Sequence, residues 1–133
     1  MPAIDLTRSE LFESLLELSL QGEFIDLHND YTCIKVSFDR KKGVCVADFK
    51  SVNNNNRWPV ASINFEDVIL TAHTFSIESV ITDLTVDTFY RGRFQDGDQL
   101  LEYSDDGKGY FYLEFYEGFA LELLSNKVTL SVQ

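Results

Sequence analysis

Side chains that commonly perform nucleophilic or metal chemistry are scarce in this chain. Its 133 residues include two histidines, His28 and His73, and two cysteines, Cys33 and Cys45. A structural zinc site takes about four such ligands, usually including a C-x-x-C pair, and no such pair occurs. No G-x-S-x-G segment occurs either, and the serines, histidines and aspartates show no order that indicates a catalytic triad. The sequence therefore predicts no metal, no other cofactor and no enzymatic site.

Arg91 and Arg93 form a compact basic spot in the segment RGR. On an extended chain, residues two apart point to the same side, so both guanidinium groups could bind an anion or a partner's carboxylates. The alternative is that each arginine pairs with a neighbouring aspartate or glutamate of the same chain. We retain both arginines as candidate contacts for a partner.

A run of tyrosines in GYFYLEFYEG forms a second candidate site. The alternation predicts a strand on which Tyr110, Tyr112 and Glu114 share one face, while the apolar residues between them face the core. Tyr116 follows in the next turn. Faces that mix tyrosines with charged groups are typical of protein-binding surfaces, but another part of the same chain can equally cover such a face. We expect these four residues to contact a partner.

Two carboxylates extend the predicted partner surface. Residues 79–89 alternate between apolar and polar side chains, which predicts a strand with one face in solvent. Asp83 and Asp87 lie on that polar face and are the remaining candidate contacts.

The charge of the chain favours one kind of partner over others. There are 22 acidic and 11 basic residues, a formal net charge of −11 at pH 7. Such a field repels nucleic acids and anionic membranes, and it accelerates the association with a basic protein. An acidic surface can also serve only to keep a small protein soluble.

The N-terminal region predicts the single helix of the protein. Thr7 and Glu10 have the spacing of a capping box, and the leucines that follow recur at intervals of three and four residues. Gln21 and Gly22 offer a left-handed stop. We therefore expect an amphipathic helix over about residues 8–21.

From residue 23 to residue 132 the apolar pattern changes to a period of two, which predicts antiparallel strands. A bulged turn at 116–118 would pair Phe111 with Leu123, and a tight turn at 125–126 would pair Leu123 with Val128. An Asp106-Gly107 turn would add residues 99–104 to this meander. The expected fold is mainly β, with about eight strands in a sandwich or a curved, partly closed sheet.

The two cysteines lie at the ends of a predicted hairpin. A loop at 40–43 pairs Phe38 with Cys45, and Ile34 with Phe49, on one face. In this register Cys33 lies on the opposite face and about 15 Å from Cys45, so that a disulfide cannot form. We expect that replacing both cysteines by serine leaves the fold intact.

Length and hydropathy indicate one cytoplasmic domain. Domains typically have about 100 to 150 residues, and 44% of this chain is apolar, so residues 1–133 suffice for one core. The N-terminal segment is acidic, with an early proline, where a signal peptide has a basic start and an apolar run. No apolar run approaches the roughly 18 to 20 residues that a membrane-spanning helix needs.

Three segments, LHNDYTCIKVSFD, VASINFEDVIL and FYEGFALELLSNKVTLSV, together have a layout that resembles small acidic β-rich immunity proteins of bacterial polymorphic-toxin systems. The resemblance implies a non-enzymatic bacterial protein that neutralises a basic toxin domain by binding it. It matches no catalytic or binding motif, so it assigns no role to any residue. Two other functions stay open: a small-ligand carrier built on a curved sheet, and a self-associating assembly subunit. The oligomeric state is open too.

Overall fold

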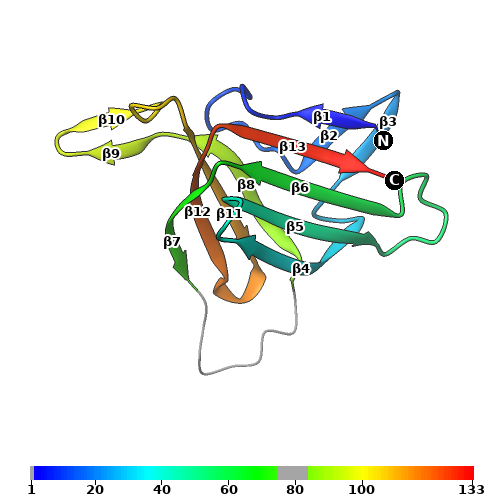
Figure 1. The fold of residues 1–133 in the computed structure, drawn as a ribbon. Helices are drawn as coiled ribbons and strands as arrows, with labels where there is room; N and C mark the ends of the chain where they lie inside the picture. Colours follow the sequence, from blue (N-terminus) through cyan, green and yellow to red (C-terminus); the bar gives the residue numbers. More distant parts are fainter. Residues whose placement is uncertain (1, 75–83) are drawn as a thin grey trace.

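The computed structural model describes residues 2–74 and 84–133, which are folded almost entirely as strands (Figure 1). The strands are β1 (Ala3–Asp5), β2 (Glu17–Leu20), β3 (Glu23–Asp26), β4 (Tyr31–Asp39), β5 (Val44–Ser51), β6 (Val60–Glu66), β7 (Ile69–Thr74), β8 (Val86–Gly92), β9 (Phe94–Asp96), β10 (Gln99–Leu101), β11 (Gly109–Phe115), β12 (Ala120–Ser125) and β13 (Lys127–Val132). One turn of 3-10 helix, Tyr116–Gly118, connects β11 to β12.

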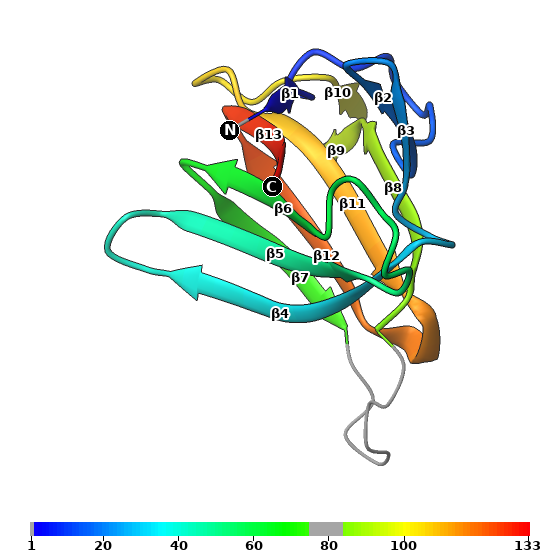
Figure 2. The same cartoon turned by 90° about the vertical axis from the view of Figure 1, so that its right-hand side faces the viewer.

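The predicted antiparallel, mainly β fold is confirmed. One sheet has the order β1-β13-β6-β5-β4 and another has the order β7-β12-β11-β8, while β2-β3 and β9-β10 are separate hairpins. Figure 2 shows the five-stranded sheet to the left of β8 and β11. The described residues hold more strands than the eight expected, because the N-terminal region adds β1 and β2 and residues 94–101 form their own hairpin.

The two larger sheets share one hydrophobic core. Alternation along β6 turns Ala61, Ile63 and Phe65 inward, and each is fully buried. The Phe65 ring lies 6.1 Å from the ring of Phe89 on β8 and 6.0 Å from that of Phe111 on β11, edge to face in both cases. Aromatic pairs in this geometry add attraction to the burial of area, so Phe65 joins one sheet to the other.

The expected hairpin between residues 120–125 and 127–132 is wrong. At Asn126 the chain passes from one sheet to the other, so that β12 pairs with β7 and β13 pairs with β6. Asp67 makes the same corner between β6 and β7, with a φ of 51°. The corners are joined because Asn126 Nδ2 donates to Asp67 Oδ2 at 3.1 Å and the buried Ser125 hydroxyl donates to the Glu66 carbonyl at 2.7 Å.

The register predicted for β11 and β12 is confirmed. Phe111 lies opposite Leu123 and Leu113 opposite Leu121, and Gly118 in the connecting turn has a φ of 84°. The turn at Asp106-Gly107 also forms, but residues 99–101 pair with β9 instead of extending a meander. The chain turns between Asp96 and Gln99, so residues 99–101 pair with the preceding strand β9 and not with β11.

The N-terminal helix expected over residues 8–21 is wrong. The Thr7 hydroxyl does not cap the Glu10 amide but accepts a hydrogen bond from the Val128 amide of β13 at 2.9 Å. Gln21 and Gly22 both have positive φ, which makes them the two-residue turn of the hairpin β2-β3. The strand region therefore begins near the N-terminus instead of at residue 23.

Backbone pairing with β8 explains why these leucines do not form a helix. The amides of Phe12 and Leu15 donate to the carbonyls of Arg91 and Phe89 at 2.7 and 2.8 Å. The segment thus runs along the edge of the four-stranded sheet, and Leu15 is buried in the core. Tertiary hydrogen bonds and burial outweigh the local helical propensity here.

The predicted hairpin of β4 and β5 forms, with one correction. Phe38 lies opposite Cys45 as expected, but a bulge at Ile34 places Cys33 opposite Phe49. Cys33 is therefore on the same, inward face as Cys45, and Ile34 is exposed. Both thiols are free and buried, so the expectation of no disulfide is confirmed.

The native thiols should react very slowly with iodoacetamide near pH 8. Burial raises the pKa of both Cys33 and Cys45 to about 11, and only the thiolate is nucleophilic. Mass spectrometry of the alkylated protein should find both thiols blocked in about 6 M guanidinium chloride and neither blocked in buffer. Rapid native alkylation would contradict the inward placement of Cys33.

The same pKa values predict how stability depends on pH. Because the folded thiols bind their protons more tightly than unfolded thiols do, their contribution is complete below about pH 8.5. It is lost as the pH rises through the folded value of about 11.

Candidate functional site

Tyr110, Tyr112 and Glu114 lie together on the outer side of β11. They alternate with buried residues that face the core, and each is half-buried. Tyr112 lies opposite Tyr90 of β8 on one side and opposite Glu122 of β12 on the other. We call this surface, made by Tyr90, Tyr110, Tyr112, Glu114 and Glu122, the tyrosine face.

An exposed ring extends the tyrosine face beyond β8. The centroid of the Tyr90 ring lies 5.4 Å from that of Tyr112 and 5.8 Å from that of Phe12. Phe12 is 59% exposed, and the Arg93 guanidinium lies over its ring at 6.0 Å. Phe12 was not among the predicted contacts, because the pattern of residues 8–21 indicated a helix. Tyr90 was not among them either, although the alternation of residues 88–92, with Phe89 inward, indicates an outward side chain at this position.

Each tyrosine hydroxyl of β11 donates a hydrogen bond to a carboxylate on the same face. The Tyr110 hydroxyl donates to Glu122 Oε1 at 2.5 Å, and the Tyr112 hydroxyl donates to Glu114 Oε2 at 2.7 Å. The bond to Glu114, together with burial, raises the pKa of Tyr112 to about 12. Burial and the bond to Glu122 raise the pKa of Tyr110 further. Both phenols therefore stay protonated and hold the carboxylates in fixed positions.

The two arginines of RGR do not form one site. Arg91 is buried, where its Nε donates to the Ser9 carbonyl at 2.5 Å and its Nη1 to Glu102 Oε1 at 2.9 Å. Its guanidinium also lies 5.7 Å from the centroid of the Tyr103 ring. Arg93 is exposed beside Phe12. Of the two alternatives predicted for Arg91, the structure therefore has the second: the arginine pairs with a carboxylate of its own chain.

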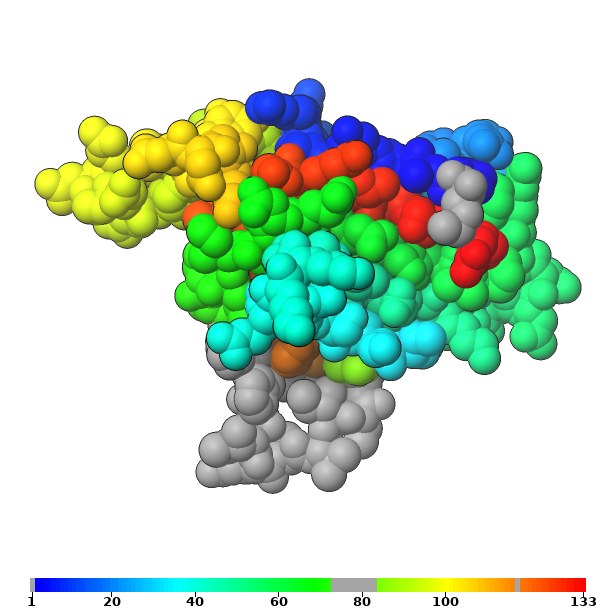
Figure 3. All heavy atoms as spheres, in the orientation of Figure 1, coloured from blue at the N-terminus to red at the C-terminus, as the bar shows by residue number. Residues whose placement is uncertain are grey.

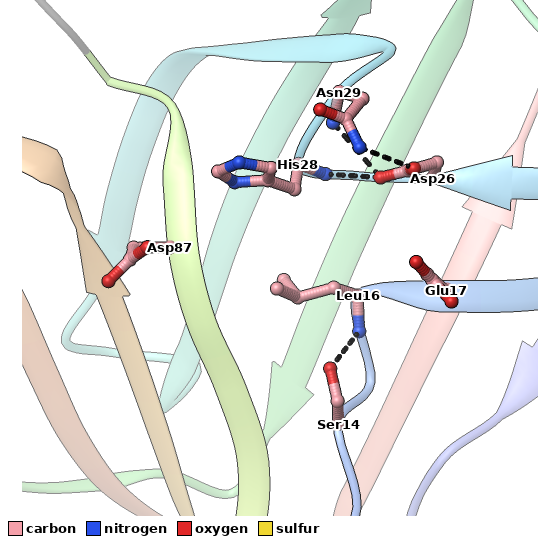
Figure 4. Close-up of a pocket in the computed structure, with 7 residues that line it drawn as sticks. All are labelled: Ser14, Leu16, Glu17, Asp26, His28, Asn29 and Asp87. Carbon is pink, nitrogen blue, oxygen red and sulfur yellow. Dashed lines mark hydrogen bonds between the residues drawn. The ribbon is translucent and has the colours of Figure 1, made fainter.

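A hollow of about 310 Å³ lies beside the end of β8 (Figure 4). Its lining residues come from the segment before β2, the first residue of β2, the last residue of β3 with the turn that follows, and β8. They are Ser14, Leu16, Glu17, Asp26, His28, Asn29 and Asp87. The predicted Asp87 is therefore part of this hollow, and the predicted Tyr116 reaches it because its hydroxyl lies 3.3 Å from His28 Nε2. Asp83 lies outside the described residues.

Three of the polar side chains that line the hollow, Asp26, His28 and Asn29, are already hydrogen-bonded within the protein. His28 Nδ1 lies 2.7 Å from the Val86 carbonyl, to which it donates. Asp26 Oδ1 accepts from the amides of His28 and Asn29, and Asp26 Oδ2 accepts from the Asn29 side chain. Burial opposes ionisation of Asp26, but these bonds outweigh it and lower its pKa. The hollow is therefore lined by a well-satisfied turn, in which Asp26 caps the amides of His28 and Asn29.

A second hollow, of about 540 Å³, lies at the tip of the β4 and β5 hairpin. Phe38, Lys42, Val44 and Val46 are among its lining residues, and Asp39 caps the turn by accepting from the amides of Lys41 and Lys42. Figure 3 shows this hairpin, in cyan, on the face toward the viewer, with the β9-β10 hairpin, in yellow, projecting to one side. No residue predicted from the sequence as a partner contact lines this hollow.

Within residues 2–74 and 84–133, no three histidine, cysteine, aspartate or glutamate side chains lie close enough to hold a metal ion. The same part of the chain contains no helix long and apolar enough to cross a membrane. Comparison of the chain with protein-family models, curated proteins and solved structures yields no match.

Proposed function

We propose that this chain is a non-enzymatic binding protein whose partner is a basic protein, and that it acts as an immunity protein against a basic toxin domain in the bacterial cytoplasm. The observation that supports this most is the tyrosine face, on which aromatic rings and carboxylates lie side by side on a protein of net charge −11. Tyrosine is enriched among the residues that dominate binding energy at protein interfaces.

The alternatives have weaker support. Pockets for small ligands are mostly apolar, whereas all the residues lining the hollow beside His28 except Leu16 are polar or charged, and Asp26, His28 and Asn29 among them are hydrogen-bonded within the protein already. Self-association through a sheet edge would bring together two surfaces of a strongly acidic protein, which repel each other.

We further infer that the two larger sheets form a sandwich. The support is the pair of edge-to-face contacts of Phe65 with rings of the facing sheet, together with the inward alternation of β6 and β11.

The proposed function predicts a salt-sensitive complex with the protein encoded by the neighbouring gene, which the hypothesis requires to be basic. Calorimetric titration at about 50 mM and about 300 mM salt should show affinity falling at least tenfold, because the higher salt screens attraction between opposite charges. The matched control is the same titration with an acidic protein of similar size. The proposal fails if the neighbouring product does not bind, or binds with an affinity that salt leaves unchanged.

A further inference from the structure

On the premise of the proposed function, we infer that the tyrosine face is the docking surface and that it receives arginine side chains of the basic partner. The guanidinium groups would stack on the rings of Tyr90 and Tyr112 and donate to the carboxylates of Glu114 and Glu122. Four features of this face favour such a partner: carboxylate oxygens without a donor, negative charge without a nearby ion pair, partly exposed aromatic rings, and side chains held in place on paired strands.

The carboxylates retain acceptor capacity. Each tyrosine hydroxyl donates to one oxygen, Tyr110 to Glu122 Oε1 and Tyr112 to Glu114 Oε2. The other oxygen of each carboxylate has no hydrogen-bond partner among residues 2–74 and 84–133. Each carboxylate can therefore accept a charge-assisted hydrogen bond from a partner without losing a bond it already makes.

The negative charge of the face is not compensated from within the described chain. The ion pairs in that part of the protein join Arg57 to Glu23, Arg91 to Glu102, and Lys108 to Asp67 and Asp106. Neither Glu114 nor Glu122 takes part in one. Arg93 lies at the edge of the tyrosine face, and its guanidinium lies over the Phe12 ring. A cationic partner therefore finds two unpaired carboxylates here, and charge complementarity selects it over a neutral or acidic one.

Elsewhere in the protein, an arginine already contacts an aromatic ring and a carboxylate at the same time. Arg91 lies over the Tyr103 ring at 5.7 Å and donates to Glu102 at 2.9 Å. Exposed arginines also lie over rings, Arg8 over Tyr103 at 5.0 Å and Arg57 over Trp58 at 4.8 Å. A planar guanidinium can stack on a ring and donate sideways to a carboxylate at the same time, whereas a lysine ammonium acts as a point charge. The tyrosine face offers the same two elements and therefore favours arginine.

The site is already in place before a partner arrives. Tyr110, Tyr112, Glu114 and Glu122 stand on paired strands, β11 and β12, whose inward faces are buried in the core. Their hydroxyl-to-carboxylate bonds limit rotation of the glutamates. Binding then costs less side-chain entropy than it would at free surface glutamates.

The test uses hexa-arginine and hexa-lysine peptides as probes of the full chain, with ¹⁵N-labelled protein followed by NMR titration. The expected result is that hexa-arginine shifts the amides of β8, β11 and β12 most and binds about fivefold more tightly than hexa-lysine, because only arginine gains both contacts. Shifts spread evenly over the acidic surface, or equal affinities for the two peptides, would overturn the inference.

A pair of variants with the same charge separates this site from general attraction. Glu114→Gln with Glu122→Gln removes two charges from the face but keeps acceptors for the tyrosine hydroxyls, so the fold should persist. Asp96→Asn with Asp98→Asn removes two exposed charges from the β9-β10 hairpin instead. We expect the first variant to weaken hexa-arginine binding about tenfold and the second less than about twofold.

Two failures can be told apart. If both double variants weaken hexa-arginine binding equally, the docking surface is wrong but a salt-sensitive complex with a basic protein is still expected. If the neighbouring gene product does not bind at all, the proposed function is wrong whatever the peptides do.

Discussion

Replacing Phe65 by alanine should lower the free energy of unfolding by about 3 to 5 kcal/mol, a loss as large as single core substitutions usually give. Phe65 is fully buried on β6, and its ring contacts those of Phe89 and Phe111 in the four-stranded sheet. The change removes buried area and leaves a cavity where the two sheets meet. Since small domains are stable by only about 5 to 15 kcal/mol, the variant should be close to unfolding at moderate temperature.

Urea unfolding followed by tryptophan fluorescence measures this effect. The matched control is Phe38→Ala, because Phe38 is 44% exposed at the tip of the β4 and β5 hairpin. That change should cost less than about 1 kcal/mol. If the two variants lose similar amounts of unfolding free energy, the Phe65 ring does not pack between the two sheets.

Replacing Arg91 by leucine should lower the free energy of unfolding by about 2 to 4 kcal/mol. The buried guanidinium binds both the Ser9 carbonyl and Glu102, so the change leaves a backbone acceptor and a carboxylate without their donor. The Glu102 side chain is 41% exposed and can turn to water, which keeps the loss below that of a fully buried pair. The N-terminal segment that contains Ser9 should also detach more easily.

Arg93→Leu is the control, since Arg93 lies two residues away and is exposed. Thermal unfolding of the two variants should differ clearly, with Arg93→Leu within about 0.5 kcal/mol of the unchanged protein. If Arg91→Leu is equally mild, the buried Arg91 guanidinium does not hold the N-terminal segment on β8 through its bond to the Ser9 carbonyl.

Local sequence patterns were enough to predict the pairing of strands that follow one another directly in the chain. The register of Phe111 with Leu123 depends on a short turn and on inward alternation, and both can be read from adjacent residues. The pairing of Phe38 with Cys45 was predictable for the same reason. The bulge at Ile34 was not, because a bulge changes the facing without leaving a distinctive residue.

Long-range pairing explains the larger errors. Ser125 and Asn126 suit a tight turn, but here they form a corner, and only the pairing of β12 and β13 with β7 and β6 decides between the two. The leucines after Thr7 fit a helical face, yet the amides of Phe12 and Leu15 pair with β8. Neither outcome is encoded within a window of neighbouring residues.

The candidate site likewise combines residues that local patterns predict with residues that only long-range pairing places there. Alternation within one strand predicted that Tyr110, Tyr112 and Glu114 share a face, and they do. Tyr90, Phe12 and Glu122 come from other parts of the chain and needed the sheet order to be placed beside them. The buried position of Arg91 was one of two alternatives, and the distant Ser9 and Glu102 decided between them.

The most direct test of the proposed function and its site is the dissociation constant of the complex with the neighbouring gene's product, measured for three forms of the protein. We expect the unchanged protein to bind, Glu114→Gln with Glu122→Gln to bind at least about tenfold more weakly, and Asp96→Asn with Asp98→Asn to stay within about twofold. Absence of binding by the unchanged protein, or equal losses in the two double variants, would contradict the account.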